Sequence, residues 1–174
     1  MAKALFDRVV AFVGLVILLP LFLVVGFMVW RQDGHSPIYA PRRVGRGGKP
    51  FHMTKIRSMV TDADKLGGSS TAGDDPRITP IGHFIRRWKL DEFSQLWNVL
   101  IGDMSLVGPR PQVEEEVATY TVEEMALLDV KPGITDFASI PRPVRWLLDN
   151  AGGDSEAAVL HDAVWRESQR GEHS

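Results

Sequence analysis

The 174-residue sequence contains no cysteine. A chain without thiols cannot form disulfides, zinc ribbons, iron–sulfur sites or a thiol nucleophile, so its reactive groups must come from carboxylates, His, Ser, Lys or Arg. The five histidines show no metal-ligand spacing, which argues against a transition-metal site. Internal repeats are absent as well, and 44% hydrophobic with 24% charged residues excludes disorder and collagen. The sequence therefore predicts one compact domain whose reactive groups are oxygen and nitrogen atoms of its side chains.

Acidic residues are scarce in the first third of the chain. Residues 1–60 hold nine Lys or Arg against two Asp, a charge of +7, whereas the remaining residues carry −9. The basic end is also the apolar end, and this combination favours an anionic membrane surface over nucleic acid, which would favour a basic face throughout the domain. The sequence therefore predicts membrane lipids as partners and no nucleic acid.

Residues 9–30 form an apolar run of 22 residues without a charge. As one helix the run would be about 33 Å long, enough to cross a hydrocarbon core. It is too long for a signal-peptide core, and no small-residue cleavage site follows it. Pro20 interrupts it, and basic residues lie on both flanks, so the positive-inside rule does not favour opposite sides. On the residues alone, a kinked span and a re-entrant hairpin broken at Pro20 fit equally well.

The rest of the chain predicts a mostly helical α+β domain. Residues 38–43 and 50–56 read as two strands around a Gly-rich turn at 44–49, which is not a Walker loop because no Lys-Ser/Thr pair opens a helix after it. Residues 58–66 predict a short helix and residues 67–80 a polar loop. Two helical segments follow over residues 81–101 and end at Gly102, and an acidic helix begins near Gln112. Residues 144–148 and 157–165 predict amphipathic helices in the tail.

The densest reactive cluster is Arg86, Arg87 and Lys89 followed by Asp91 and Glu92 at a predicted helix start. A helix start accepts a phosphate, but acidic residues in a first turn are also ordinary caps, so the cluster by itself leaves both interpretations open. Adjacent side chains point about 100° apart on a helix. Asp91 and Glu92 therefore suit one nucleophile or base and one metal ligand, with Mg²⁺ as the compatible ion.

Two further cations are candidate phosphate ligands. Arg110 stands between two prolines in a stiff loop, where a guanidinium can bind phosphate bidentately or simply cap a helix. Lys55 ends the second predicted strand and can meet an anionic headgroup or only solvent.

Four motifs in order resemble the bacterial sugar transferase family, the monotopic phosphoglycosyl transferases. They are KIRSM at 55–59, the run from Arg86 through LDEFSQLWNVL to residue 100, GDMSLVGPRP at 102–111 and KPGIT at 131–135. The resemblance covers about residues 3–145. It implies a re-entrant membrane hairpin over residues 1–32 and a catalytic domain over 33–145, and it leaves residues 146–174 as the amphipathic tail.

The resemblance also implies roles for individual residues. Asp91 is the expected nucleophile, Glu92 is associated with Mg²⁺ and the reacting group, and Lys55, Arg86 and Arg110 match cations near the substrate phosphates. The helix break falls at Pro20. The sequence departs from the family at Leu19, where many members have Ser, at Ser94, where most have Pro, and over residues 135–142, so it does not define the sugar.

The implied reaction loads a sugar-1-phosphate from a UDP-sugar onto polyprenol (undecaprenyl) phosphate in two steps through Asp91, with release of UMP. It would begin glycan or glycoconjugate assembly at the cytoplasmic face of a bacterial inner membrane. Two alternatives stay open: a non-catalytic relative that holds a lipid phosphate or a partner, and an Mg-dependent phosphohydrolase. The tail could pack on the domain, lie on the membrane or form a homodimer.

Overall fold

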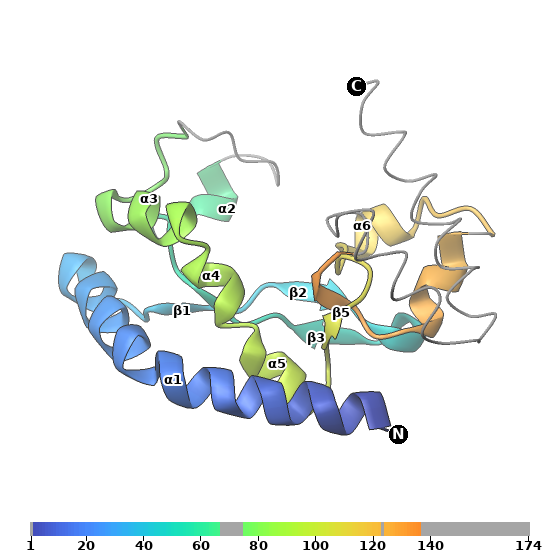
Figure 1. The fold of residues 1–174 in the computed structure, drawn as a ribbon. Coiled ribbons are helices and arrows are strands. Elements are labelled where there is room, and N and C mark those ends of the chain that lie inside the picture. The colour runs from blue at the N-terminus through green and yellow to red at the C-terminus, as the bar shows by residue number, and fades with distance from the viewer. Residues whose placement is uncertain (1, 67–74, 123, 137–174) are drawn as a thin grey trace.

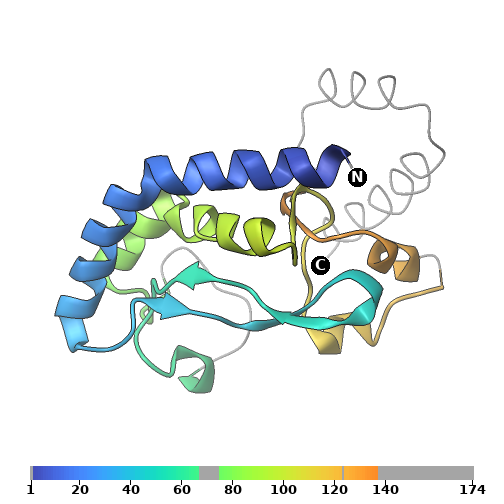
Figure 2. The ribbon, with the colours of Figure 1, turned by 90° about the horizontal axis from the view of Figure 1, so that it is seen from below.

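A long helix carries a smaller body of short helices and strands along one side (Figures 1 and 2). The computed structural model describes residues 2–66, 75–122 and 124–136. Within them, a mostly helical chain with a few two-stranded sheets confirms the fold class at that level. The predicted tail over residues 146–174 lies outside the described residues, and the proposed domain division stays a prediction.

The long helix is α1 (Ala2–Asp33), which holds Pro20 in its interior. The chain stays helical through Pro20, and the helix bends partway along its length instead of losing its helical structure (Figure 1). Most apolar side chains of α1 are exposed, with Ile17 at 70%, and the few buried positions include Ala11 and Val29. By length and composition, α1 is the one helix among the described residues that could cross a membrane. The re-entrant arrangement stays a prediction.

The predicted hairpin is present as a ribbon of four short strands. β2 (Arg42–Val44) pairs antiparallel with β3 (Pro50–His52), and β1 (Ile38–Tyr39) pairs antiparallel with β4 (Lys55–Ile56). The turn between β2 and β3 contains η1 (Arg46–Gly48), in which Gly47 and Gly48 take left-handed φ angles of 68° and 71°. Glycine adopts this conformation without steric cost, which is why the Gly-rich segment forms the turn.

Four helices follow the ribbon: α2 (Ala63–Leu66), α3 (Pro80–Arg87), α4 (Leu90–Phe93) and α5 (Leu96–Ile101). Thr79 caps α3 by accepting a hydrogen bond from the Gly82 N–H at 3.0 Å, as expected for Thr before a Pro-initiated helix. The predicted helix over residues 58–66 is wrong in its first half, because Met59 forms a β-bridge with Ile78 there. The helical segment that was predicted from Asp91 onward is two helices, since the chain turns at residues 94–95.

The remaining elements lie beyond Gly102, which ends α5 in a left-handed conformation as predicted. β5 (Ser105–Val107) pairs parallel with β6 (Gly133–Thr135), and α6 (Glu114–Val117) and η2 (Glu124–Asp129) lie between them in sequence. Gly133 packs so closely on Gly108 that an added Cβ would lie 2.1 Å from the Gly108 nitrogen. Glycine at this position therefore lets the two backbones meet.

Two apolar clusters form the core, and α1 contributes to both. One cluster joins the first half of α1 to β3, α5 and the start of β5, and the other joins its second half to β4, α3 and α4. In the second cluster Ile56, Ile85 and Leu90 are buried, and each directly precedes or follows a predicted site residue in sequence. Burial of these neighbours holds the backbone at Lys55, Arg86 and Asp91 in place.

Candidate active site

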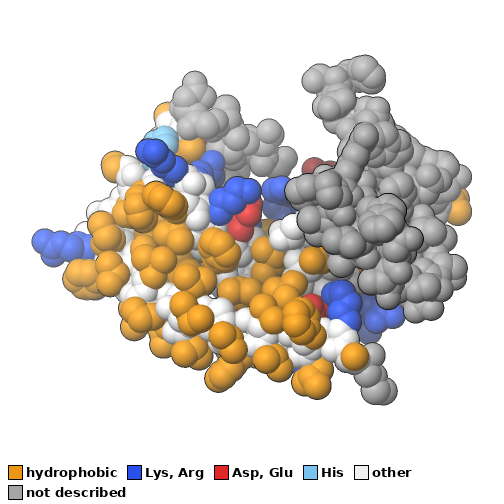
Figure 3. Space-filling view, in the orientation of Figure 1, with side chains coloured by type: hydrophobic (Ala, Val, Ile, Leu, Met, Phe, Trp, Pro, Cys, Tyr) orange, Lys and Arg blue, Asp and Glu red, His pale blue; other side chains and the backbone are white. Residues whose placement is uncertain are grey.

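All five residues predicted to bind or react with phosphate line one cavity of about 590 Å³. β4 contributes Lys55, α3 contributes Arg86, α4 contributes Asp91 and Glu92, and the loop after β5 contributes Arg110. Figure 3 shows acidic side chains flanked by basic ones near the middle of the face, above the apolar surface. Segments up to 55 residues apart in sequence therefore meet at one place.

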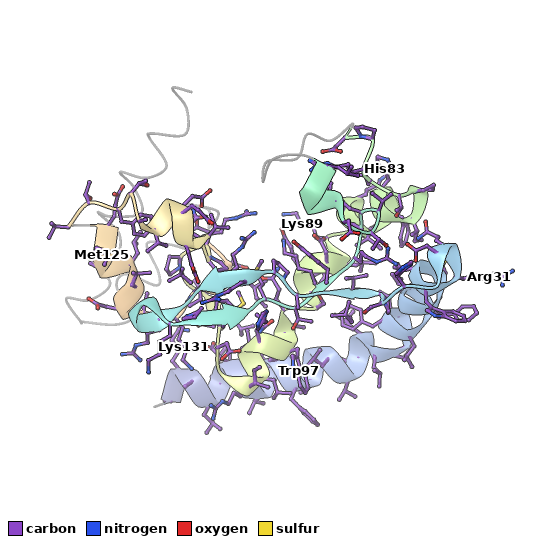
Figure 4. The ribbon with its side chains drawn as sticks, turned by 180° about the vertical axis from the view of Figure 1, so that it is seen from behind. Arg31, His83, Lys89, Trp97, Met125 and Lys131 are labelled. Carbon is purple, nitrogen blue, oxygen red and sulfur yellow. The ribbon has the colours of Figure 1, made fainter. Side chains whose placement is uncertain are left out.

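The two carboxylates lie in the single turn of α4 and both are partly exposed. The turn is preceded by Lys89 in a left-handed conformation with φ of 53°, which is rare for a residue with a side chain. The Lys89 Nζ lies 3.8 Å from the Glu92 Oε2, and Lys89 is at the rim of the cavity (Figure 4). Because α4 has only four residues, its dipole adds little, and the cations around it must supply most of the positive potential.

Lys55 is a partly buried cation of the cavity. Burial lowers the pKa of its ammonium, the negative charge of Asp91 opposes this shift, and the positive charges of Arg110 and Arg43 add to it. Among the described residues, no carboxylate lies within ion-pair distance of Lys55. A half-desolvated ammonium in this state is well placed to bind an anionic ligand.

Hydrogen bonds from neighbouring residues hold the site backbone and side chains. The Arg86 Nε donates to the Ser58 Oγ at 3.0 Å. This bond does not use the two terminal nitrogens of the guanidinium group. The buried Ser94 hydroxyl lies 2.7 Å from the Asp91 carbonyl oxygen and 3.1 Å from that of Thr54, so it can donate to either. Ser94 thus links the Asp91 turn to the residue directly before β4, the strand that carries Lys55.

Asn98 makes a second link, to the end of β3 and the segment that joins β3 to β4. Its Oδ1 accepts from the Thr54 N–H and its Nδ2 donates to the His52 carbonyl, both at 2.8 Å. The side chain is 1% exposed, so these bonds satisfy two backbone groups that water does not reach. Asn98 was not among the sequence-predicted residues, because its role depends on a strand 44 residues away.

Arg43 also lines the cavity, although the sequence indicated only that it belongs to a basic flank. Its neighbour Arg42 forms an ion pair with Glu114 at 2.8 Å. Successive side chains of a strand point to opposite faces, and of the two adjacent arginines on β2 only Arg43 reaches this cavity. Strand alternation was therefore the signal that could have found Arg43, but the register of β2 was needed to choose between the two.

The donor set fits Mg²⁺ better than a transition metal. Among the described residues, no three His, Asp or Glu side chains are grouped closely enough to hold a metal ion. Mg²⁺ is commonly bound through one or two carboxylates together with substrate phosphates and water. Asp91 and Glu92 would provide the two carboxylates for such an ion, and the surrounding cations would attract the phosphates.

The fold and the site define a class of protein: an α+β body on a long apolar helix, with a carboxylate pair in a cation-lined cavity. The chain belongs to the bacterial sugar transferase family, because the family model of that description matches residues 1–153.

Characterised relatives share much of this chain. One relative is the UDP-galactose-lipid carrier transferase of Erwinia amylovora, and another is the undecaprenyl-phosphate galactose phosphotransferase of Salmonella typhimurium. The chain is 43% identical to each of them over 148 residues, which cover 76% of this chain and 31% of the relative. It is 40% identical over 143 residues to the UDP-glucose:undecaprenyl-phosphate glucose-1-phosphate transferase of Xanthomonas campestris, over 80% of this chain and 30% of the relative. The chain thus spans about a third of the length of these relatives.

Proposed function

We propose that this protein transfers a sugar-1-phosphate from a UDP-sugar to a polyprenol phosphate, of which undecaprenyl phosphate is the expected form, and releases UMP. The observation that carries the proposal is the single cavity that gathers Asp91 and Glu92 with Lys55, Arg86 and Arg110. Relatives named as transferases of galactose or glucose phosphate to undecaprenyl phosphate support it. The product would begin the assembly of a glycan or glycoconjugate.

In the first step, a carboxylate oxygen of Asp91 attacks the sugar-linked phosphorus. The bond from this phosphorus to the bridging oxygen breaks, and UMP leaves with the electron pair. In the second step, a phosphate oxygen of the polyprenol phosphate attacks the same phosphorus, the bond to Asp91 breaks, and the carboxylate is restored. A carboxylate is a competent nucleophile for phosphoryl transfer, as in aspartyl-phosphate ATPases.

The cations of the cavity stabilise the charge that builds up during both steps. Phosphoryl transfer depends mainly on positioning and on neutralising the oxygens around phosphorus. Arg86 is oriented by its bond to Ser58, Lys55 is partly desolvated, and Arg110 lies in the loop on the other wall. These three side chains can hold the diphosphate while Asp91 attacks.

Asp91 and Glu92 would hold Mg²⁺ together with the substrate phosphates. The bound ion would neutralise phosphate charge and favour departure of UMP. We expect chelation to stop UMP release and added Mg²⁺ to restore it.

We further propose that α1 is re-entrant, with both ends on the cytoplasmic side of the bacterial inner membrane. At its start, Asp7 accepts a hydrogen bond from Ser105 at 2.7 Å and pairs with Lys3 at 2.8 Å. At its end, Asp33 pairs with Arg57. Both ends thus bond to the same body, whereas a helix that crossed the membrane would place them on opposite sides. Pro20 lies inside α1, which bends partway along its length (Figure 1), and this bend supports the arrangement.

Exposed apolar side chains of α3, α4 and α5 extend the apolar surface of α1. They include Trp97, which lies on the α1 side of the molecule in Figure 4. Tryptophan is enriched at membrane interfaces, so this surface would lie at the level of the lipid headgroups. The acceptor phosphate would be at the same level, close to the cavity. The whole set is Phe84, Trp88, Phe93, Trp97 and Ile101.

The decisive experiment is intact mass spectrometry of the purified protein in detergent, after brief exposure to a panel of UDP-sugars with Mg²⁺. We expect a sugar-phosphate increment with one donor, accompanied by UMP, and no increment in Asp91→Asn. Release of free sugar phosphate without acceptor would favour a phosphohydrolase. No adduct and no UMP with any donor, from folded protein, would favour a non-catalytic relative.

The absence of cysteine makes the topology directly testable. Ala2→Cys and Gln32→Cys place one thiol near each end of α1. A membrane-impermeant maleimide should label both from the cytoplasmic side of inverted vesicles if the helix is re-entrant. Labelling of the two thiols from opposite sides would show that the helix spans the membrane.

A further inference from the structure

A second cavity of about 880 Å³ adjoins the one already described. Arg43, Lys55, Arg86, Asp91 and Val113 line both cavities and therefore form the boundary between them. We call the four charged residues of this boundary the junction. It contains the proposed nucleophile and three cations, so the reacting phosphorus belongs here and the two ends of a donor extend into different cavities.

The two cavities differ in the chemistry of their walls. The larger one combines apolar and aromatic side chains from β1, β4 and the segment after β4 with the Ser36 and Thr61 hydroxyls and with several charged side chains. The smaller one is lined mainly by amide and charged side chains. Its polar wall consists of Lys89, Glu92, Gln95, Arg110, Gln112 and Glu116.

Cations in the larger cavity that lie outside the junction already have carboxylate partners. Arg42 pairs with Glu114 at 2.8 Å, Arg57 with Asp33 at 2.5 Å, and Arg77 with Asp75 at 2.5 Å. Neutralised guanidinium groups attract a further phosphate weakly. The diphosphate is therefore drawn to the junction and not to the far wall of the larger cavity.

Resting on the proposed function, we propose that the donor lies across the junction, with its nucleoside in the larger cavity and its sugar in the smaller one. A planar base gains most from apolar and aromatic contacts such as Tyr39 and Val60 offer, and ribose hydroxyls can pair with Ser36 and Thr61. A hexose carries hydroxyl groups on most carbons, and amide, carboxylate and ammonium groups satisfy them.

A polyprenyl chain suits the larger cavity less well than a nucleoside does. An isoprenoid needs a continuous apolar path, because burying charged groups against hydrocarbon is costly. The wall of this cavity includes Arg42, Arg57, Arg77, Asp62 and Glu114. These charges favour a polar ligand with one flat apolar part, which describes a nucleoside.

Val60→Trp tests the assignment, because Val60 lines only the larger cavity and is 38% exposed. A larger side chain there can fill the cavity without displacing the core. We expect at least a tenfold loss of UMP affinity by calorimetry and a matching rise in the KM for the UDP-sugar, with the KM for polyprenol phosphate unchanged. Val122→Trp, at a 90% exposed position that lines neither cavity, is the matched control and should change nothing.

Glu116→Trp provides the complementary test in the smaller cavity. It should leave UMP affinity within about twofold of the wild type and alter the ratio of kcat/KM between UDP-sugars. If Val60→Trp does not fold, Tyr39→Ala removes the aromatic contact instead and should weaken UMP binding three- to tenfold.

Unchanged UMP affinity in folded Val60→Trp, or in folded Tyr39→Ala, would overturn the proposal. So would loss of UMP affinity in Glu116→Trp, which would reverse the orientation, and a rise only in the KM for polyprenol phosphate, which would assign the larger cavity to the lipid. Failure of the proposed function is a separate result: the wild-type protein would then release no UMP from any UDP-sugar.

Discussion

The Arg57 guanidinium binds the Asp33 carboxylate through two contacts, Nη1 to Oδ2 at 2.5 Å and Nη2 to Oδ1 at 2.7 Å. The Arg57 Nε also donates to the Ser36 carbonyl at 2.9 Å. This arrangement ties the last residue of α1 to the chain directly after β4, two residues beyond Lys55. The end of the apolar helix and a wall of the candidate active site are thus held together.

Arg57→Ala should loosen this tie, since it leaves Asp33 without its bidentate partner. We expect a lower Tm in detergent and a reduced rate of UMP release, because β4 would hold Lys55 less firmly. Arg57→Lys keeps the charge but cannot make the bidentate contact, so its Tm and its rate of UMP release should lie between those of the wild type and Arg57→Ala.

Arg31→Ala is the matched control for the Arg57 variants, since Arg31 is exposed and points away from the body (Figure 4). It should leave both the Tm and the rate unchanged. Equal effects of Arg31→Ala and Arg57→Ala would contradict a specific role for the ion pair.

Asn98→Ala should destabilise the fold without touching the cavity wall. It leaves the Thr54 N–H and the His52 carbonyl without partners in a buried place, at a cost of about 2–4 kcal/mol. Thermal unfolding should show a Tm about 5–15 °C lower. Asn98→Asp keeps an acceptor for the Thr54 N–H but cannot donate to the His52 carbonyl when it is ionised, so its Tm should also be lower. A Tm as high as that of the wild type in either variant would contradict this role of Asn98.

Arg43→Ala should weaken catalysis, because it removes a cation from the junction. Loss of one charge-assisted contact to a phosphate predicts a fall in kcat/KM of about 10- to 100-fold for the UDP-sugar. Arg46→Ala removes an exposed arginine of η1, three residues later, that lines neither cavity, so it should leave kcat/KM unchanged. The same loss in both variants would point to a general effect of net charge and not to a contact at the junction.

The pH dependence of donor binding should reflect Lys55. Burial lowers its pKa below the usual value of 10.5, so the folded protein loses this proton at a lower pH than the unfolded chain does. Phosphate binding needs the charged form, so affinity for UMP should fall as the pH rises through the lowered pKa. Over the same window the unfolded chain binds more protons, so the contribution of Lys55 to the free energy of unfolding rises with pH.

Lys55→Arg provides the control for this titration, because a guanidinium stays charged throughout the accessible range. Its UMP affinity should be flat where that of the wild type declines. A decline of the same shape in Lys55→Arg would assign the titration to another group.

Part of the fold and site follows from local sequence features. The uncharged run at 9–30 lies within one long helix, the glycines at 47 and 48 allow the turn, the helix expected from Ile81 begins one residue earlier at Pro80, and Gly102 ends α5. These outcomes depend on interactions within a few residues, so the sequence predicts them. The motifs likewise identify the family.

Other features were decided only by the tertiary structure. The adjacency of Asp91 and Glu92 is a property of the sequence, but the approach of Lys55 and Arg110 to them comes from packing β4 and the loop after β5 around α4. Which of Arg42 and Arg43 enters the site depends on the strand register and on Glu114. Spacing along a chain sets local geometry, whereas a cavity and its charges arise from contacts between distant segments, and only the folded backbone determines those.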